Sequence, residues 1–318
     1  MSELLSNFGA VASQVFVLFL LIAVGFICGK TKLIDDTISK GLSDLVLYFA
    51  TPAVIVSSFI RPFEESMLVK FIIAFAISTV FHIISGILAF VLIRNKNIDS
   101  RLVGQFGIIF SNAGYMALPL QKAILGDLGV FFGSAYVAVF NIILWTVGLV
   151  FMGGKDTKIT AKKLFFNPGV MATVIGLVIF LTNSANIIPS PIQSAVIHIG
   201  NLNTPVPMII IGYYLSKSKI ISAITDSRIW LPITTRLIFS PLVSLVLLML
   251  LQMSPLRIEN TIAVSCIVAV SAPCAAVTTV FSAKYNRDTA LSVKLVSVST
   301  LLSIITMPLF VALAQQIL

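Results

Sequence analysis

Two polar interruptions stand out within the long apolar stretches of this sequence. The first interruption is Ser111-Asn112-Ala113-Gly114 and the second is Ser271-Ala272-Pro273-Cys274. A proline removes a backbone donor and disturbs the hydrogen bond to the carbonyl four residues earlier, so N–H groups after Pro273 are expected to stay free. A helix N-terminus with free N–H groups carries about half a positive charge and suits a carboxylate. The pattern predicts an anion site where the interruptions meet, lined by Ser111, Asn112, Gly114, Tyr115, Ser271, Pro273 and Cys274.

Further asparagines and several prolines lie within the apolar stretches. Asn141 and Asn203 are candidate substrate ligands, because a buried amide in a membrane needs a partner; a hydrogen bond between helices is the alternative. The steps Thr51-Pro52 and Thr204-Pro205 are either hinges or packing kinks. The candidate break or hinge residues are Pro52, Pro119, Pro205 and Pro273.

Ionisable side chains are almost absent from the apolar stretches. His82, His198 and Asp44 are the candidates for carrying a proton, although a lone buried histidine is more commonly a packing residue. No Asp or Glu falls in the middle of an apolar stretch, which argues against a carboxylate proton relay and against an intramembrane aspartyl protease. Because the three cysteines are scattered and no HExxH motif occurs, we expect neither a metal site nor a cofactor.

The composition requires a bilayer around these stretches. The 318 residues are 58% hydrophobic and 10% charged, with a mean hydropathy of +1.06. A soluble domain needs roughly a quarter charged residues, and a backbone in hydrocarbon must satisfy its own hydrogen bonds, as a helix does. The expected fold is therefore all-α and integral to the membrane.

Apolar runs bounded by charges or by Pro and Gly predict ten transmembrane helices. The expected spans are Val11–Cys28, Leu42–Ile60, Leu68–Ile93, Leu102–Leu125, Gly129–Met152, Gly169–Leu181, Ile192–Leu215, Ile229–Leu251, Thr261–Ala283 and Thr289–Ala314. With both termini on the extracytoplasmic side of the cell membrane, fifteen Lys and Arg residues fall in cytoplasmic loops and four on the opposite side. The net charge of +9 is thus an orientation signal toward anionic lipid, and no nucleic-acid partner is expected.

The two halves of the chain resemble each other. Thr51-Pro52 and Thr204-Pro205 are 153 residues apart, and the polar interruptions occupy corresponding spans 4 and 9. Five spans per half is an odd number, so the halves must enter the membrane in opposite senses, as an inverted repeat. The domains are then residues 1–152, a cytoplasmic linker at 153–168, and residues 169–318. Small residues and a proline kink in one span fit simple close packing, but matched breaks in both halves favour a binding site.

Three longer motifs resemble the auxin efflux carrier family. Ser111–Leu120 (SNAGYMALPL) resembles its N-x-G-[FY]-x-G-[IL]-P-L stretch, with Ala117 in place of the usual glycine. Ser271–Tyr285 resembles its A-P-x-A…V-F-A-x-x-Y stretch, and Ser299–Leu309 resembles its S-T-L-x-S-x-x-T-x-P-L ending. The family includes bacterial malate and malonate permeases and the plant PIN-formed auxin carriers.

The resemblance implies two inverted five-span repeats, with broken helices 4 and 9 crossing at the substrate site. It also implies a scaffold of spans 1, 2, 6 and 7, a moving unit of spans 3–5 and 8–10, an elevator mechanism and a homodimer. The family's crossing asparagine corresponds to Asn112 and its span-9 proline to Pro273, whereas Ser111 replaces the span-4 proline. We therefore expect a secondary carrier of a small carboxylate, such as malate or malonate. A non-transporting solute sensor or the membrane subunit of a larger assembly is the alternative.

Overall fold

The computed structural model describes residues 2–154, 166–218, 220–254 and 257–318, and every regular element in these ranges is helical. The predicted linker, with Lys155, Lys158, Lys162 and Lys163, falls largely outside the described residues. The α-helices are α1 (Ser2–Lys30), α2 (Asp36–Leu45), α3 (Thr51–Phe59), α4 (Glu65–Leu92), α5 (Ile98–Ile109), α6 (Leu118–Ile143), α7 (Leu149–Gly153), α9 (Pro168–Leu181), α10 (Ser190–Asn201), α11 (Pro205–Lys217), α12 (Ile220–Ile224), α13 (Trp230–Thr234), α14 (Ser240–Gln252), α15 (Asn260–Ser271), α16 (Val277–Lys284) and α17 (Thr289–Ile317). Short 3₁₀ turns lie at η4 (Ser184–Asn186) and η5 (Ser227–Ile229).

Seven helical stretches of the described chain are long and apolar enough to cross a membrane. They are Val11–Lys30, Asp36–Phe59, Glu65–Leu92, Ala113–Gly153, Ser190–Lys217, Ser227–Gln252 and Thr289–Ile317. Two shorter apolar helices, α9 and α15, join them. The described chain is all-helical and rich in apolar helices, as the composition predicts. The ten predicted spans, however, do not correspond to ten continuous helices.

The difference from the predicted spans arises at breaks and kinks. Predicted spans 4 and 5 share one helical stretch of 41 residues, Ala113–Gly153, whose path bends at Gly126. Gly126 has φ +65° and ψ −149°, a conformation that essentially only glycine adopts. Predicted spans 4, 7 and 9 are each divided in two, as α5 with the η2–α6 segment, as α10 with α11, and as α15 with α16.

Widened π-helical turns precede three of the prolines. The segments η1 (Val46–Ala50), η2 (Ala113–Ala117) and η6 (Thr235–Phe239) come just before Pro52, Pro119 and Pro241. Proline lacks an N–H and clashes with the carbonyl four residues earlier, and a wider turn removes both conflicts. At Pro52 and Pro119 the helix consequently continues, whereas Pro205 starts α11 directly after a break. A fourth π-helical segment, η3 (Leu144–Gly148), has no proline after it.

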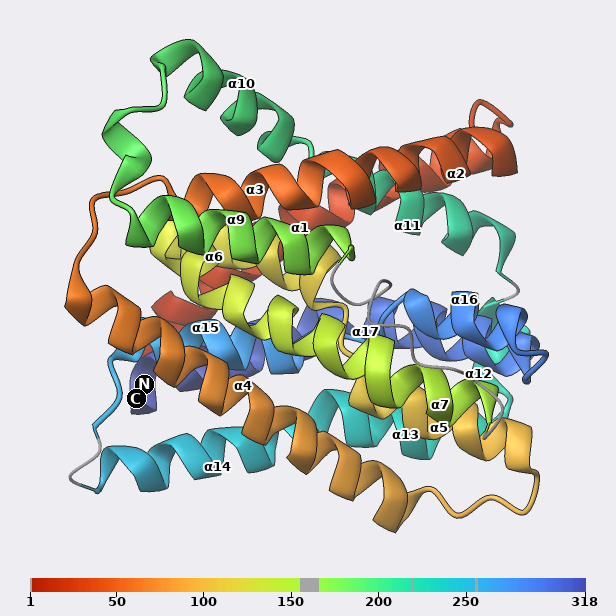
Figure 1. The fold of residues 1–318 in the computed structure, drawn as a ribbon. Coiled ribbons are helices and arrows are strands. Elements are labelled where there is room, and N and C mark those ends of the chain that lie inside the picture. The colour runs from red at the N-terminus through yellow and green to blue at the C-terminus, as the bar shows by residue number, and fades with distance from the viewer. Residues whose placement is uncertain (1, 155–165, 219, 255–256) are drawn as a thin grey trace.

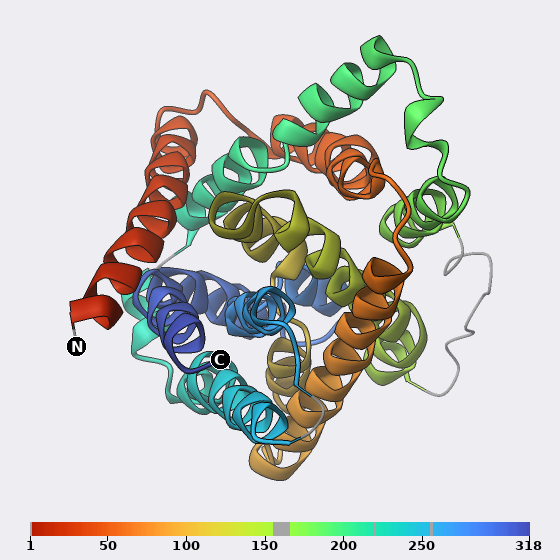
Figure 2. The ribbon, with the colours of Figure 1, turned by 90° about the vertical axis from the view of Figure 1, so that its left-hand side faces the viewer.

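The helices form a bundle in which the chain begins and ends at the same end (Figures 1 and 2). Helix α1 packs on α11 and α17, α3 packs on α9 and α10, and α15 lies among α4, α6 and α17. Helices α1 and α11 approach to backbone contact, because a Cβ atom on Gly25 would lie 2.0 Å from the Ile209 oxygen. Helix α10 lies at the edge of the bundle (Figure 1).

Candidate functional site

The two polar interruptions of the sequence lie against each other in the structure. Helix α5 ends at Ile109 and α15 ends at Ser271, and a short extended segment follows each. The Asn112 N–H donates to the Pro273 carbonyl at 2.8 Å, and the Ala275 N–H donates to the Phe110 carbonyl at 2.9 Å. Ser111 thereby faces Cys274 in an isolated antiparallel bridge. We call this paired segment, residues 110–114 with 272–277, the crossing.

Four backbone donors at the crossing have no acceptor among the described residues. They are the N–H groups of Gly114 and Tyr115 at the start of one half-helix, and of Ala276 and Val277 at the start of the other. All four residues are half-buried, so these donors are not sealed in the core. A Cβ atom on Gly114 would meet no heavy atom within 4 Å, so there is open space at this point. Free N–H groups at helix N-termini beside open space form an arrangement that binds anions.

Asn112 places a side-chain amide at the same point. The residue is 5% exposed, and its Nδ2 atom finds no acceptor among the described residues. A buried unpartnered amide is costly, which fits a group whose partner is a substrate.

A polar chain extends from Ser111 into helix α6. The Ser111 hydroxyl donates to the Tyr136 hydroxyl at 3.2 Å, and the His82 ring lies 4.6 Å from the Tyr136 ring, centroid to centroid. The His82 Nδ1 atom is 2.8 Å from the Ser78 carbonyl, which can only accept, so Nδ1 carries a proton and donates this bond. Nε2 has no partner in the described part of the chain. The sequence suggested His82 but not Tyr136, because their contact joins residues on different helices.

The polar residues of the second interruption, Ser271 and Cys274, form hydrogen bonds that stabilise the break itself. The Ser271 hydroxyl donates to the Val268 carbonyl at 3.1 Å, within its own helix. The Cys274 N–H donates to the Ser299 hydroxyl at 3.2 Å, which ties the break to α17.

Asn203 connects the crossing with the neighbouring helices. The Thr51 hydroxyl donates to its Oδ1 atom at 2.6 Å, and its Nδ2 atom donates to the Gly114 carbonyl at 3.4 Å. The two Thr-Pro segments therefore meet through this amide, and Asn203 touches the backbone of the break.

Three other candidates lie away from the crossing. The Asn141 amide donates to the Val137 carbonyl at 2.9 Å in its own helix and faces Gly169 at the start of α9. His198 is exposed on α10, and Asp44 is exposed on α2. None of the three forms a hydrogen bond with the crossing among the described residues, but Asp44 is close enough to Tyr115 to interact with it electrostatically.

Arg236, for which the sequence predicted no role, reaches the crossing from η6. Its side chain is fully buried and donates to the carbonyls of Ile108, Val270 and Ala272. A charged residue far inside an apolar stretch is the sequence signal that could have identified it.

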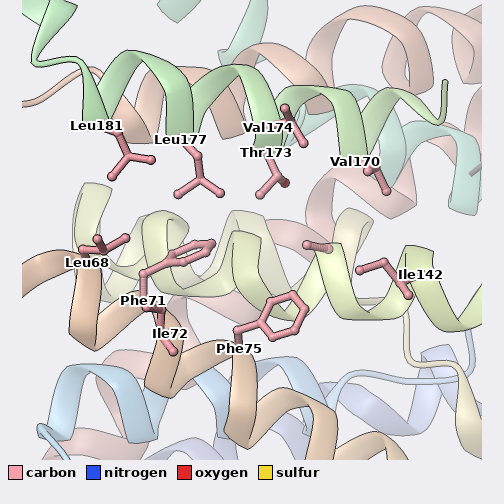
Figure 3. A pocket seen from close by; sticks show the side chains of 11 residues that line it. Leu68, Phe71, Ile72, Phe75, Ile142, Val170, Thr173, Val174, Leu177 and Leu181 are labelled. Carbon is pink, nitrogen blue, oxygen red and sulfur yellow. The ribbon is translucent and has the colours of Figure 1, made fainter. Parts of the chain in front are cut away.

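The apolar cavity in Figure 3 is a separate feature. It measures about 330 Å³ between α4, α6 and α9, and Thr173 is the one polar residue in its lining. An apolar cavity of this kind has no positive charge for a carboxylate, so it is not the proposed anion site.

Comparison with known proteins places the chain among transporters. A family model described as "Membrane transport protein" matches residues 10–163 and 155–311. The chain belongs to this family. An uncharacterized transporter of Methanocaldococcus jannaschii is 24% identical over 311 residues, which cover 93% of this chain and 96% of that protein.

Membership confirms the resemblance to the auxin efflux carrier family and establishes the chain as a membrane transport protein. Two of the motif residues that carried the resemblance, Asn112 and Pro273, are hydrogen bonded to each other across the crossing of this family member. The described residues contain no group of three or more His, Cys, Asp or Glu side chains that could hold a metal.

Proposed function

We propose that this protein is a secondary carrier of a small organic anion, such as malate, malonate or another carboxylate. One observation carries the proposal: N–H groups from two helix N-termini and the Asn112 amide, none of which has a partner among the described residues, lie at one crossing. A carboxylate accepts several such bonds at once, and the helix ends add favourable electrostatics.

We further propose ten spans arranged as two inverted repeats. Span 4 would consist of α5 with η2 and the start of α6, and span 9 of α15 with α16. The kink at Gly126 would separate spans 4 and 5, and α9 would be span 6. The pairing of the two breaks and the contact between the two Thr-Pro segments support this assignment, because an inverted repeat brings equivalent breaks together.

Transport would follow an elevator mechanism in the cell membrane. The packing of α1 on α11 and of α3 on α9 and α10 supports a scaffold of spans 1, 2, 6 and 7. Spans 3–5 and 8–10 would carry the crossing past it. The bond from Asn203 to Gly114 joins the two units and would have to open during each cycle. Both termini are proposed to be extracytoplasmic, and a homodimer is the proposed assembly.

The test is uptake into proteoliposomes that contain the purified protein. Radiolabelled malonate is the probe, with malate, acetate and indole-3-acetate as competitors. We expect saturable uptake that short dicarboxylates inhibit best. Protein-free liposomes are the background control.

Absence of uptake for every carboxylate of the panel, from protein that is folded and inserted, would contradict the carrier proposal. If radiolabelled malonate still bound such protein, a solute sensor would be the better account.

A further inference from the structure

Arg236 is a buried positive charge without an acidic partner. Its side chain is fully buried, and no salt bridge within the described part of the chain includes it. Removal of a charge from water costs several kcal/mol, so a lone guanidinium in this position must be compensated by other groups.

The compensating groups are backbone carbonyls at the ends of both half-helices. Nη1 donates to the Ile108 carbonyl at 2.7 Å in the last turn of α5. Nε donates to the Ala272 carbonyl at 3.1 Å, just after α15, and Nη2 donates to the Val270 carbonyl in its last turn. One side chain thus caps two helix C-termini that belong to different halves of the sequence.

The local backbone explains how Arg236 reaches both ends. Residue 236 lies in the widened turn η6, which is followed by Pro241. Such π-turns displace a side chain from its regular direction and recur at functional sites. The planar fork of arginine can then bond several carbonyls at once, which the single ammonium of lysine does less well.

We propose that Arg236 sets the charge preference of the crossing by cancelling the two negative helix ends. This inference rests on the proposed function, since it concerns the same anion site. Each helix C-terminus carries about half a negative charge and each N-terminus about half a positive charge. With the two C-termini neutralised by one guanidinium, the two N-termini at Gly114 and Ala276 remain uncompensated. The crossing then has an excess of about one positive charge and favours an anion over a neutral molecule of equal shape.

Arg236 acts here as a positioning and electrostatic residue and does not touch the substrate. Arg236 bonds to carbonyls where α5 and α15 end, before the breaks. The free N–H groups belong to the segments that follow the breaks. A purely structural cap would support binding of charged and neutral ligands equally. An electrostatic cap would support the anion selectively.

The test compares competitors of different charge in wild type, Arg236→Lys and Arg236→Gln. Malonate, malonamate and malonamide compete with radiolabelled malonate for uptake into proteoliposomes. We expect Arg236→Gln to reduce the preference for malonate over malonamide about tenfold or more, because one unit charge is lost from a site shielded from water. Arg236→Lys should keep the preference. Arg228→Gln is the matched control, because it removes one charge from the same span at the end of the bundle, and it should keep the wild-type preference.

Each outcome is decisive. An unchanged preference in folded Arg236→Gln, or a lost preference in folded Arg236→Lys, would overturn the inference. If Arg236→Gln does not fold, Arg236→Met is the second variant without the charge, and it is expected to show the same tenfold loss of preference; an unchanged preference in folded Arg236→Met would overturn the inference. Wild-type protein that transports no carboxylate would instead reject the proposed function.

Discussion

Asn112 has a buried side-chain amide that finds no acceptor in the described part of the chain and therefore requires a partner. It is 5% exposed, and its backbone N–H is already bonded to the Pro273 carbonyl, so only the amide is available to a substrate. Asn112→Ala should weaken malonate binding by about 1–3 kcal/mol, the value of one hydrogen bond to a charged group. The competition of unlabelled with radiolabelled malonate on purified protein measures this loss.

The matched control for that variant is Asn141→Ala. Its amide bonds within its own helix and lies away from the crossing. If Asn112→Ala binds malonate as tightly as Asn141→Ala does, Asn112 is not a substrate ligand.

Asp226 anchors a cluster of charges where three parts of the chain meet. Its carboxylate lies 2.7 Å from an Arg228 nitrogen and 2.8 Å from the Lys294 ammonium, and its side chain is 10% exposed. The hydrogen bonds from Arg228, followed by the bond from Lys294, hold the pKa of Asp226 well below its usual range. A carboxyl whose pKa is lower in the folded state stabilises the fold above its unfolded pKa of about 3.9, and this stabilisation is lost as pH falls through the folded value.

We therefore predict that Asp226→Asn lowers stability by about 1–3 kcal/mol at pH 7. The difference from wild type should stay constant down to about pH 4 and shrink only at more acidic pH. Melting temperatures of the detergent-solubilised proteins across this range provide the measurement. Asp127→Asn is the control, because its pair with Lys122 is exposed and should contribute little. A difference that shrinks already between pH 7 and pH 5 would refute the assignment.

Sequence alone could predict the residues that break a helix, but it could not predict the residues that bond to the break. Asn112 and Pro273 stand out as polar or helix-breaking types inside apolar stretches. Arg236 stands out as a charge inside an apolar stretch, but its partners do not, and Tyr136 has no such signal, because both side chains take their roles from groups on other helices.

At the scale of elements, Pro273 keeps α15 from running into α16. With no N–H of its own, it cannot bond to the Ala269 carbonyl, and its own carbonyl instead accepts the Asn112 N–H. Pro273→Ala would supply that missing donor, so the helix should extend and withdraw the Pro273 position from Asn112. We predict a fall in malonate uptake of about tenfold or more, equivalent to about 1.4 kcal/mol, with expression preserved.

Pro308→Ala is the comparison variant, because Pro308 lies inside the continuous helix α17. This variant removes a proline from the proposed moving unit, to which Pro273 also belongs, but it changes no helix break. Wild-type uptake by Pro273→Ala would show that the interruption of this helix is dispensable.

Helix content could be predicted from the sequence, but the lengths of the elements could not. Asn167 before Pro168 is an N-cap pattern that can be recognised in the sequence, and its side chain accepts the N–H groups of Gly169 and Val170. The boundary predicted between Leu125 and Gly129 coincides with the kink at Gly126, whereas the break at Leu202–Thr204 falls inside one predicted span, because a hydropathy window averages over a single Thr-Pro step.

At the scale of the whole molecule, the charges predict how transport is driven. Neither break contains a carboxylate, so the crossing has no acidic side chain that could carry a coupled proton, and His82 is the one histidine near it. We therefore predict electrogenic movement of the anion without obligatory proton coupling. Movement of one charge through 100 mV corresponds to about 2.3 kcal/mol, so an inside-negative potential favours export.

The measurement is malonate flux in proteoliposomes with the potential clamped by potassium and valinomycin under an imposed pH gradient. Flux should follow the clamped potential, and His82→Gln should retain it, with the exposed His198→Gln as its control. Uphill accumulation driven by the pH gradient alone, and abolished in His82→Gln, would establish proton coupling instead.

The central claim, that the crossing belongs to a carrier, is tested most directly by counterflow. Proteoliposomes preloaded with unlabelled malonate are diluted into a trace of radiolabelled malonate at zero membrane potential. A carrier with one alternating site exchanges internal for external substrate, so label should accumulate transiently above its equilibrium level. The overshoot should be much smaller for Asn112→Ala than for Asn141→Ala. Label that only equilibrates, with no overshoot in wild type, would contradict the carrier account.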